Sequence, residues 1–354
     1  MSPKFRFQII SDLHLETPLM SPSYSTFHLP IHAPNLFLLG DTGLTSHPQL
    51  FTFLSTLLHT HTSLRIFYIL GNHEAYHTTL GTSTAALSAF EAQQGPQRFT
   101  FMNRRRIDIS ATLTILGCTL WTHIPPSSSL ACANSLTDFN EEKGIWARSV
   151  EQHNIDHTTD LSWLNATIAS IPLDRQVIVL THHSPTIDPR ANHPRHGGSS
   201  TNAGFRSDLS AEECWRSERV RVWGFGHTHY SCQFYEEDGG KLVVANQKGY
   251  GKRDGVVVVV EEGGDGGWRV VIGEKEEREG SGRKGMEEGI VNVGGCGDEL
   301  GAGAGAGVEG KEIKSTAVKD NPTEEKVGEI HLEPKNASRW RTAMVKIKNS
   351  LHKS

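Results

Sequence analysis

Side chains that could bind a metal occur in five short stretches of this chain, and each stretch follows an apolar run typical of a buried strand. The stretches are Asp12-Leu13-His14, Gly40-Asp41, Gly71-Asn72-His73-Glu74, Thr181-His182-His183 and Gly226-His227-Thr228-His229. The apolar runs before them cover residues 5–10, 36–39, 66–70, 177–180 and 222–225. Because groups at the carboxyl ends of successive strands line one crevice of an open α/β sheet, we expect these side chains to converge. Carboxylate, amide and imidazole groups in one place predict a metal site.

Several of these residues suit a site that holds two cations. Two divalent ions about 3.5–4 Å apart need a carboxylate that touches both. Asp41 is placed for that role, because Gly40 before it has no side chain and lets the backbone turn sharply at the strand end. Asn72 offers a neutral oxygen, which limits the net charge of the site. His227 and His229 flank a single residue and can point to different ions.

The order of the stretches, D-x-H, G-D, G-N-H-E, H and G-H-x-H, resembles the calcineurin-like metallophosphoesterase superfamily, with fungal-type members, over roughly residues 5–250. The resemblance implies an α/β fold, a four-layer α/β/β/α sandwich in which helices flank two mixed β-sheets. It also implies two divalent metal ions. Their ligands would be Asp12, His14, Asp41 and His229 for the first ion, and Asp41, Asn72, His182 and His227 for the second.

The same resemblance implies that His73 is the catalytic histidine, which binds no metal and faces the substrate phosphate. His182 is assigned as a ligand in preference to His183, because the family's ligand normally comes first after the strand.

The sequence departs from the family pattern in the second stretch. The family often has G-D-x-x-D there, whereas here Asp41 is followed by Thr42-Gly43-Leu44. The missing acid is usually not a ligand, so we expect the metal site with altered local hydrogen bonding.

The activity implied by the resemblance is that of a hydrolase, a metallophosphoesterase. It would cleave phosphomonoester or phosphodiester bonds by attack of a metal-bridging hydroxide at a dinuclear centre. Nitrogen and oxygen ligands fit Mn, Fe or Zn. The motifs do not separate a phosphatase from a phosphodiesterase, because their shared chemistry is the metal centre. A non-catalytic metal-binding scaffold and an adaptor of the same fold stay open as alternatives.

Three residues outside the five stretches are candidates for contact with a phosphate ester substrate. His193 and His196 lie in a loop rich in Pro and Gly at residues 189–198, and such loops often carry substrate contacts. Tyr250 follows the G-H-x-H stretch and could line the pocket. The alternative for both histidines is a solvated loop position without a special role.

Composition narrows the class of protein. A formal net charge of −5 over 354 residues gives no argument for nucleic-acid binding. The five cysteines form no C-x-x-C pair, which favours reduced thiols. The sequence shows neither a signal-peptide pattern nor an apolar run of transmembrane length, so we expect a cytoplasmic location.

The chain is expected to divide near residue 272. Residues 1–272 alternate strand-like and helical patterns and form the catalytic domain, whereas residues 273–354 are low in complexity and are expected to be a disordered tail. Residues 338–352 could form a short basic amphipathic helix, with Trp340, Met344 and Ile347 on one face. Such a helix could contact a partner or an anionic membrane surface. A solvated tail is the alternative, because helices this short are marginal alone.

Patterns within the first region predict individual elements. Apolar spacing predicts helices at residues 48–59, 79–93 and 160–171, the last with Asp160 as its N-cap. Runs of β-branched and aromatic residues predict strands at residues 113–117, 233–236, 242–245, 256–261 and 268–272. Turn residues between some of these strands favour antiparallel pairing.

Overall fold

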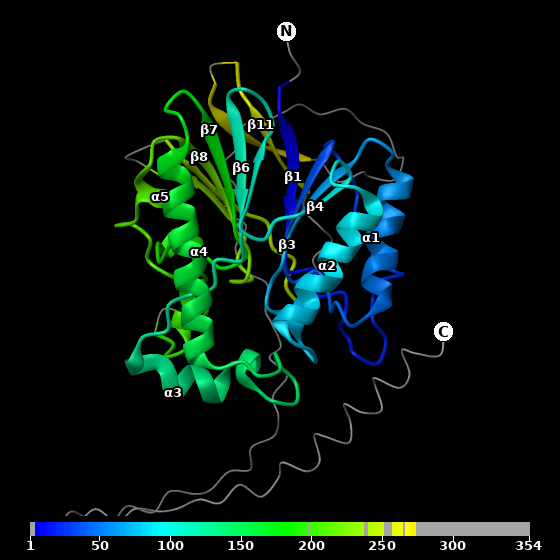
Figure 1. The fold of residues 1–354 in the computed structure, drawn as a ribbon, viewed down its shortest axis with the longest axis vertical. Coiled ribbons are helices and arrows are strands. Elements are labelled where there is room, and N and C mark those ends of the chain that lie inside the picture. Colours follow the sequence, from blue (N-terminus) through cyan, green and yellow to red (C-terminus); the bar gives the residue numbers. More distant parts are fainter. Residues whose placement is uncertain (1–3, 197, 237–239, 251–256, 265, 274–354) are drawn as a thin grey trace, which may run out of the picture. The chain divides into compact units, whose positions relative to one another are not determined.

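The computed structural model describes residues 4–196, 198–236, 240–250, 257–264 and 266–273 (Figure 1). The predicted tail and its amphipathic helix at residues 338–352 lie outside the described residues. In the described part, twelve strands form two six-stranded sheets. None of the helices described there is long and apolar enough to cross a membrane.

The first sheet has the strand order β12-β11-β1-β2-β3-β4. Its strands are β1 (Arg6–Ile10), β2 (Asn35–Leu39), β3 (Arg65–Ile69), β4 (Phe99–Phe101), β11 (Val257–Glu262) and β12 (Trp268–Gly273). Strands β1 to β4 run parallel, and β11 and β12 extend the sheet beyond β1 in antiparallel fashion. The carboxyl ends of β1, β2 and β3 therefore lie at the same edge of this sheet.

The second sheet has the order β5-β6-β7-β8-β10-β9. Its strands are β5 (Arg105–Asp108), β6 (Leu113–Gly117), β7 (Gln176–Leu180), β8 (Val220–Gly224), β9 (Cys232–Tyr235) and β10 (Leu242–Ala245). The four central strands run parallel, and the edge strands β5 and β9 run antiparallel to their neighbours. Both sheets are thus mixed, as the sequence predicts.

The prediction of antiparallel pairing is correct for β9 with β10 and for β11 with β12. It is wrong for two other contacts, because β6 pairs in parallel with β7, and β10 pairs in parallel with β8. The chain between β6 and β7 includes helices, and a long crossover of this kind returns the chain in the same direction.

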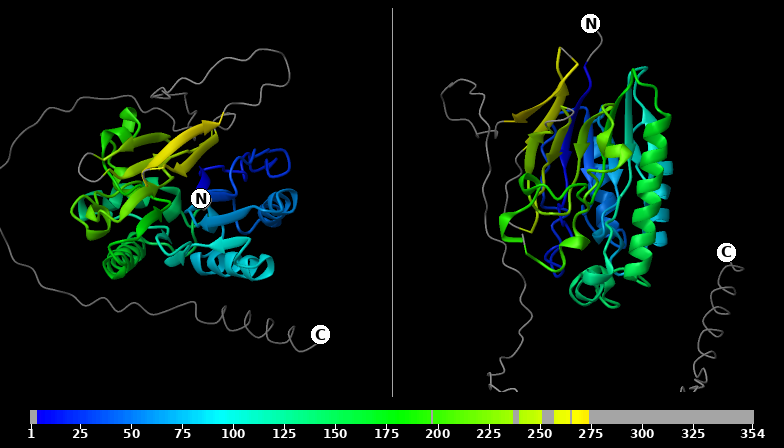
Figure 2. Two further views of the ribbon diagram at one scale, coloured as in Figure 1. Left: turned by 90° about the horizontal axis from the view of Figure 1, so that it is seen from above. Right: turned by 90° about the vertical axis from the view of Figure 1, so that its left-hand side faces the viewer.

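The two sheets pack against each other, and helices cover their outer faces (Figures 1 and 2). Alternation along the strands explains the layers, because successive side chains point to opposite faces. Phe37 of β2 packs between the sheets with Ile178 of β7, whereas Leu38 packs outward in a cluster with Leu54 of helix α1. On the second sheet, the outward Val179 shares a cluster with Leu164 of helix α4. The four-layer α/β/β/α sandwich is confirmed.

The helices are α1 (Pro48–Thr60), α2 (Leu80–Gln94), α3 (Pro126–Ser135), α4 (Val150–Ser170) and α5 (Glu213–Arg216). Short 3₁₀ turns are η1 (His73–Ala75), η2 (Thr137–Phe139), η3 (Pro189–Ala191), η4 (Pro194–His196) and η5 (Asn202–Gly204). The predicted start of the third helix is wrong. Helix α4 begins at Val150, where the Ser149 side chain caps it by accepting a hydrogen bond from the Gln152 N–H. Asp160 lies within the helix and is buried.

Candidate metal centre

The five predicted stretches lie at the carboxyl ends of β1, β2, β3, β7 and β8. Hydrogen bonds join the loops of the two sheets at this edge. Nδ1 of His182, after β7, lies 2.8 Å from the carbonyl oxygen of Leu39 at the end of β2. The His227 N–H, after β8, donates to Asp12 Oδ2 at 3.0 Å, after β1. Loops that are far apart in the sequence therefore build one site.

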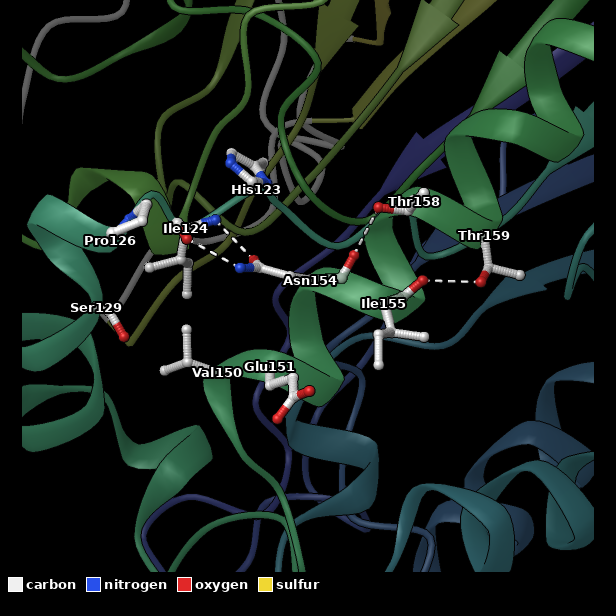
Figure 3. A pocket seen from close by; sticks show the side chains of 10 residues that line it. All are labelled: His123, Ile124, Pro126, Ser129, Val150, Glu151, Asn154, Ile155, Thr158 and Thr159. Carbon is white, nitrogen blue, oxygen red and sulfur yellow. Dashed lines mark hydrogen bonds between the residues drawn. The ribbon is translucent and has the colours of Figure 1, made fainter.

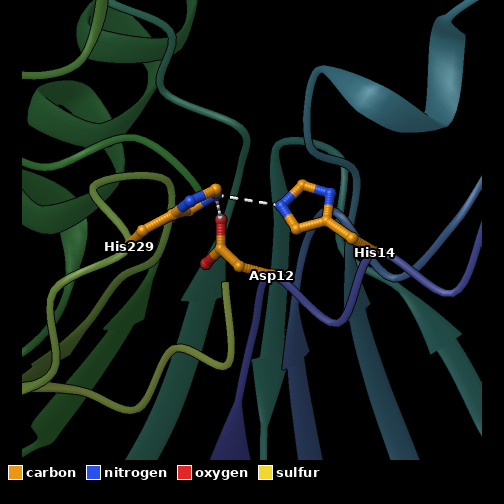
Figure 4. Close-up of side chains that lie close together, drawn as sticks. All are labelled: Asp12, His14 and His229. Atoms are coloured by element: carbon orange, nitrogen blue, oxygen red, sulfur yellow. Dashed lines mark hydrogen bonds and ion pairs between the residues drawn. The ribbon is translucent and has the colours of Figure 1, made fainter. Parts of the chain in front are cut away.

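The first group of converging ligand atoms comprises Asp12, His14 and His229, which lie within 4.8 Å of one another (Figure 4). Nε2 of His14 lies 2.9 Å from Nε2 of His229, and the latter lies 3.4 Å from Asp12 Oδ1. Nδ1 of His14 lies 3.2 Å from a carboxylate oxygen of Glu16, which only accepts hydrogen bonds. Nδ1 of His14 therefore carries the proton, and its Nε2 offers a lone pair to this group. Such a donor set fits a divalent cation.

The second group comprises Asp41, His182 and His227. Nε2 of His182 lies 3.5 Å from Asp41 Oδ1, 3.1 Å from His227 Nδ1 and 3.0 Å from Oδ1 of Asn72. The other carboxylate oxygen of Asp41 faces the first group, 4.0 Å from Nε2 of His14. The two groups are therefore adjacent, and Asp41 lies between them.

Asn72 presents its oxygen to this second group because its amide nitrogen is held on the other side. Nδ2 donates to Asp138 Oδ1 at 2.8 Å and to the Tyr76 hydroxyl at 2.9 Å. The Tyr76 hydroxyl in turn donates to Asp138 Oδ1 at 2.6 Å. The network assigns the orientation of the amide, since a carboxylate can only accept. Sequence patterns did not single out Asp138 or Tyr76.

The backbone at these strand ends is unusual. Asp12, His14, Asp41, His227 and His229 have φ between 47° and 68°. This left-handed region is uncommon for residues other than glycine, although Asp and His enter it more readily than most. Conformations of this kind gather at functional sites, where the surrounding structure enforces them. Here they turn the side chains of successive residues toward the same edge of the sheets.

Two glycines let the loops approach closely. A Cβ on Gly71 would lie 2.2 Å from Asp41 Oδ1, and a Cβ on Gly40 would lie 2.4 Å from His182 Nδ1. Gly40 also has a φ of 87°, which glycine adopts without strain. Gly40 and Gly71, which precede Asp41 and Asn72, therefore make room for other ligands.

Glu74 organises the loops after β2 and β3 without facing the ligand groups. Oε2 accepts the N–H groups of Gly71 and Asp41 at 2.8 and 2.9 Å. Oε1 accepts the Thr42 N–H at 2.8 Å and the Tyr68 hydroxyl at 2.7 Å. Burial and the nearby Asp41 charge raise the pKa of Glu74 to about 7.

Opposing effects set the charges of the ligand groups. Burial favours the neutral form of Asp41, but the neighbouring imidazoles of His182 and His73 hold its pKa well below the usual value. Burial also lowers the pKa of His182, and the Asp41 carboxylate overcomes this and raises it to about 10. Burial and the charge on His182 lower the pKa of His227 to about 3. A cation bound here would compete with the proton on His182, since metal ligands must be deprotonated.

His73 lies beside the first group and is partly open to solvent, with its side chain 15 % exposed. Its Nδ1 lies 2.9 Å from Glu16 Oε1, and its Nε2 lies 3.2 Å from the Tyr250 hydroxyl. Burial lowers the pKa of His73, but the Asp41 and Glu16 carboxylates outweigh this and raise it to about 9. The Tyr250 ring also stacks on His14, with centroids 4.3 Å apart. The structure thus brings Tyr250 to the candidate site.

The other two predicted substrate contacts lie in a separate loop. The His193 ring contacts His196 and Tyr230, with centroids 5.9 and 5.6 Å apart. The groups of converging ligand atoms found among the described residues include neither His193 nor His196. His183, the unassigned neighbour of His182, is fully buried, and neither of its ring nitrogens has a hydrogen-bond partner in the described structure. Its ring lies 4.2 Å from that of His227, so it packs behind a ligand residue.

A groove of about 750 Å³ between α3 and α4 lies apart from these groups (Figure 3). Asn154 holds one wall, because its side chain donates to the Ile124 carbonyl and accepts the Ile124 N–H. The residues that line the groove are His123, Ile124, Pro126, Ser129, Val150, Glu151, Asn154, Ile155, Thr158 and Thr159. None of the predicted site residues is among them.

Comparison with known proteins decides the family. The family model described as calcineurin-like phosphoesterase matches residues 5–231, which include all five stretches in full. The chain belongs to the calcineurin-like phosphoesterase family. The matched region ends shortly after His229, so Tyr250 lies outside it.

One relative and one solved structure each match more than two thirds of this chain. An uncharacterized protein of Acanthamoeba polyphaga mimivirus is 27% identical over 263 residues, which are 68% of this chain and 90% of that protein. The crystal structure of phosphopantetheinyl hydrolase from Mycobacterium tuberculosis superposes with a TM-score of 0.53 at 13% identity. That superposition covers 79% of this chain and 100% of the other, and it shows a shared fold.

Proposed function

We propose that this protein is a metal-dependent phosphoesterase that hydrolyses phosphomonoester or phosphodiester bonds at a dinuclear centre. The observation that supports this most is that the group of Asp12, His14 and His229 adjoins the group of Asp41, His182 and His227, with one carboxylate oxygen of Asp41 toward each. One ion would be held by Asp12, His14, Asp41 and His229, and the other by Asp41, Asn72, His182 and His227. Mn, Fe and Zn all suit this mixture of nitrogen and oxygen ligands.

Two bound cations would neutralise charge on the phosphoryl oxygens and lower the pKa of a bound water. The protein's own contribution comes from His73. Its Nδ1 is held by Glu16, so Nε2 is the atom that faces the candidate centre, 3.2 Å from the Tyr250 hydroxyl and 4.0 Å from Asp41 Oδ2. A pKa raised to about 9 keeps the imidazole protonated near neutral pH. His73 can therefore stabilise charge on the phosphate and donate a proton to the departing oxygen.

Tyr250, His193 and His196 are proposed as substrate contacts. Support for Tyr250 comes from its place beside His73 and His14. The proposal for the two histidines rests on their loop, which includes η3 and η4. We assign the activity to residues 1–272, because all proposed site residues lie between Asp12 and Tyr250.

The experiment is metal analysis of the purified protein followed by assays on a panel of phosphomonoesters and phosphodiesters. In His73→Ala we expect kcat to fall by about 10²–10⁴-fold while the metal content is unchanged, since a general acid typically contributes this factor. Asp41→Asn should instead lose both metals. His59→Ala, which changes an exposed histidine in α1, is the matched control and should behave as wild type.

Two results would contradict the proposal. Loss of metal from His73→Ala would show that this residue is a ligand. A wild-type protein with neither bound metal nor hydrolysis of any panel substrate would favour a non-catalytic scaffold.

A further inference from the structure

Glu16 is a buried carboxylate at the edge of the candidate metal centre, outside the five sequence stretches. It lies two residues after His14 and is 2% exposed. Its Oε1 lies 3.2 Å from His14 Nδ1 and 2.9 Å from His73 Nδ1. The two imidazole rings meet edge to face, with centroids 4.4 Å apart. One oxygen atom therefore contacts a proposed metal ligand and the proposed catalytic histidine.

This contact determines which nitrogen of the neutral His14 ring carries the proton, and it fixes the orientation of the His73 ring. An ionised carboxylate only accepts hydrogen bonds, so both Nδ1 atoms must donate to it. Both Nε2 atoms then face the centre. That of His14 lies 2.9 Å from His229 Nε2, and that of His73 lies 4.0 Å from Asp41 Oδ2. With the other tautomer, His14 would present an N–H to the site and could not bind a cation there.

Apart from Asp41, the loop after β2 (residues 40–47) contains no carboxylate. Leu44, three residues after Asp41, is apolar. Leu44 is 1% exposed and lies in the apolar core beside the first sheet, where its N–H donates to the Tyr24 hydroxyl at 3.0 Å. Among the described residues, the carboxylate that contacts Nδ1 of His73 comes instead from the loop after β1.

We propose that Glu16 is a positioning residue that fixes the tautomer and ring orientation of His14 and the ring orientation of His73. The part that concerns His73 rests on the proposed function, whereas the part that concerns His14 is a statement about metal binding. Removing a group that orients a metal-binding histidine typically costs about 10–100-fold in metal affinity or activity. Because Glu16 contacts the histidines and is buried behind them, its loss should lower kcat and leave KM nearly unchanged.

The first test compares two substitutions of Glu16. Glu16→Leu removes the acceptor at similar size, and Glu16→Gln keeps one acceptor oxygen. For the Leu variant we expect metal binding about 10–100-fold weaker, measured by competition with a chromogenic chelator, and a similar fall in kcat. The Gln variant should recover part of both. Glu91→Gln is the matched control, since Glu91 pairs with Arg105 away from the centre, and it should match the wild type.

A double-mutant cycle with His73→Ala separates the two effects. If Glu16 acts on catalysis through His73, Glu16→Leu should not lower kcat further in the His73→Ala background. Its effect on metal affinity should persist there, because that effect passes through His14. Fully additive losses in kcat would overturn the role toward His73, and unchanged metal affinity would overturn the role toward His14.

A second measurement is made on the unmodified protein, and a variant is needed only to assign its signals. Imidazole ¹⁵N shifts, assigned with His14→Ala, should show the proton of the neutral His14 ring on Nδ1. A proton on Nε2 of the neutral His14 ring would overturn the proposal. If the wild type binds metal but hydrolyses no ester, the proposed function fails. Metal competition and the ¹⁵N shifts then decide the role of Glu16 by themselves.

Discussion

At the scale of single residues, the candidate ligands are held from the side that faces away from the converging atoms. Nδ1 of His182 donates to the Leu39 carbonyl at 2.8 Å, and Nδ2 of Asn72 donates to Asp138 at 2.8 Å. The first contact keeps a proton on Nδ1 of His182, and the second fixes the orientation of the Asn72 amide, whether or not an ion is bound. The site is therefore preorganised, and the supporting residues should affect metal binding nearly as strongly as the ligands do.

Glu74 allows a prediction at this scale. Its two carboxylate oxygens accept three backbone N–H groups and the Tyr68 hydroxyl. In Glu74→Gln, an amide NH₂ would replace one oxygen and face N–H donors, which leaves buried groups unpaired. We expect the free energy of unfolding to fall by about 2–3 kcal/mol, measured by urea denaturation. Glu151→Gln, an exposed position at the start of α4, controls for the loss of charge. A Glu74→Gln variant as stable as this control would contradict the role assigned to these hydrogen bonds.

Among single residues, the sequence predicts the proposed metal ligands but not the residues that support them. Each proposed ligand lies just after a strand, so a local pattern of apolar run, turn and polar residue is enough to predict it. Glu16 and Asp138 belong to no such pattern. Glu16 is 57 residues from its partner His73, and Asp138 is 66 residues from its partner Asn72. Contacts across such separations depend on how the loops pack, which no short sequence window contains.

At the scale of elements, the strands that carry ligands were predicted within a residue or two, while other elements were missed for physical reasons. Strand β5 contains charged residues, and its positions alternate between partly buried and exposed. Strand β4 is only three residues long. The first half of α4 buries His153 and His157 where an aliphatic stripe would be expected. Without that stripe, the helical period was visible only after Asp160.

Asp160 of α4 supports the loop after β6 and gives a prediction for pH. Oδ2 accepts the Leu120 N–H at 2.8 Å, and Oδ1 accepts from Arg104 at 2.6 Å. Burial raises the pKa of Asp160 from 3.8 to about 6, although the Arg104 hydrogen bond opposes the shift. Because the pKa of Asp160 is higher in the folded state than in the unfolded state, protonation of Asp160 stabilises the folded protein, and this stabilisation is fully present below about pH 4. It is lost as the pH rises through about 6.

The wild type should therefore lose about 3 kcal/mol of unfolding free energy from this group between pH 4 and pH 7, because each pKa unit corresponds to about 1.4 kcal/mol. Asp160→Asn cannot titrate. Its stability relative to the wild type should increase by that amount over the same interval, measured by denaturant unfolding at each pH. Asp208→Asn controls for net charge at an exposed position. Parallel curves for Asp160→Asn and the wild type would contradict the prediction.

At the scale of the whole molecule, the candidate centre draws its ligands from both sheets. Asp12, His14, Asp41 and Asn72 follow strands of the first sheet, and His182, His227 and His229 follow strands of the second. Each proposed ion would therefore connect the two halves of the sandwich. Because unfolding separates these halves, bound metal should stabilise the entire domain and not only its loops.

At this scale we predict how removal of metal changes the thermal stability of the protein. With free metal about 100-fold above the dissociation constant, each ion adds about 2.7 kcal/mol to the free energy of unfolding. Each kcal/mol shifts Tm by about 2–4 °C for a domain of roughly this size. Chelation of two ions should thus lower Tm by roughly 10–20 °C, as measured by calorimetry. Asp41→Asn is the control, because a protein that has already lost both ions should not respond to the chelator.

A chain ending at residue 273 contains every proposed ligand and should show the same shift as the full chain. A smaller shift in the truncated chain would show that the C-terminal residues contribute to metal binding, contrary to the assignment of the activity to residues 1–272.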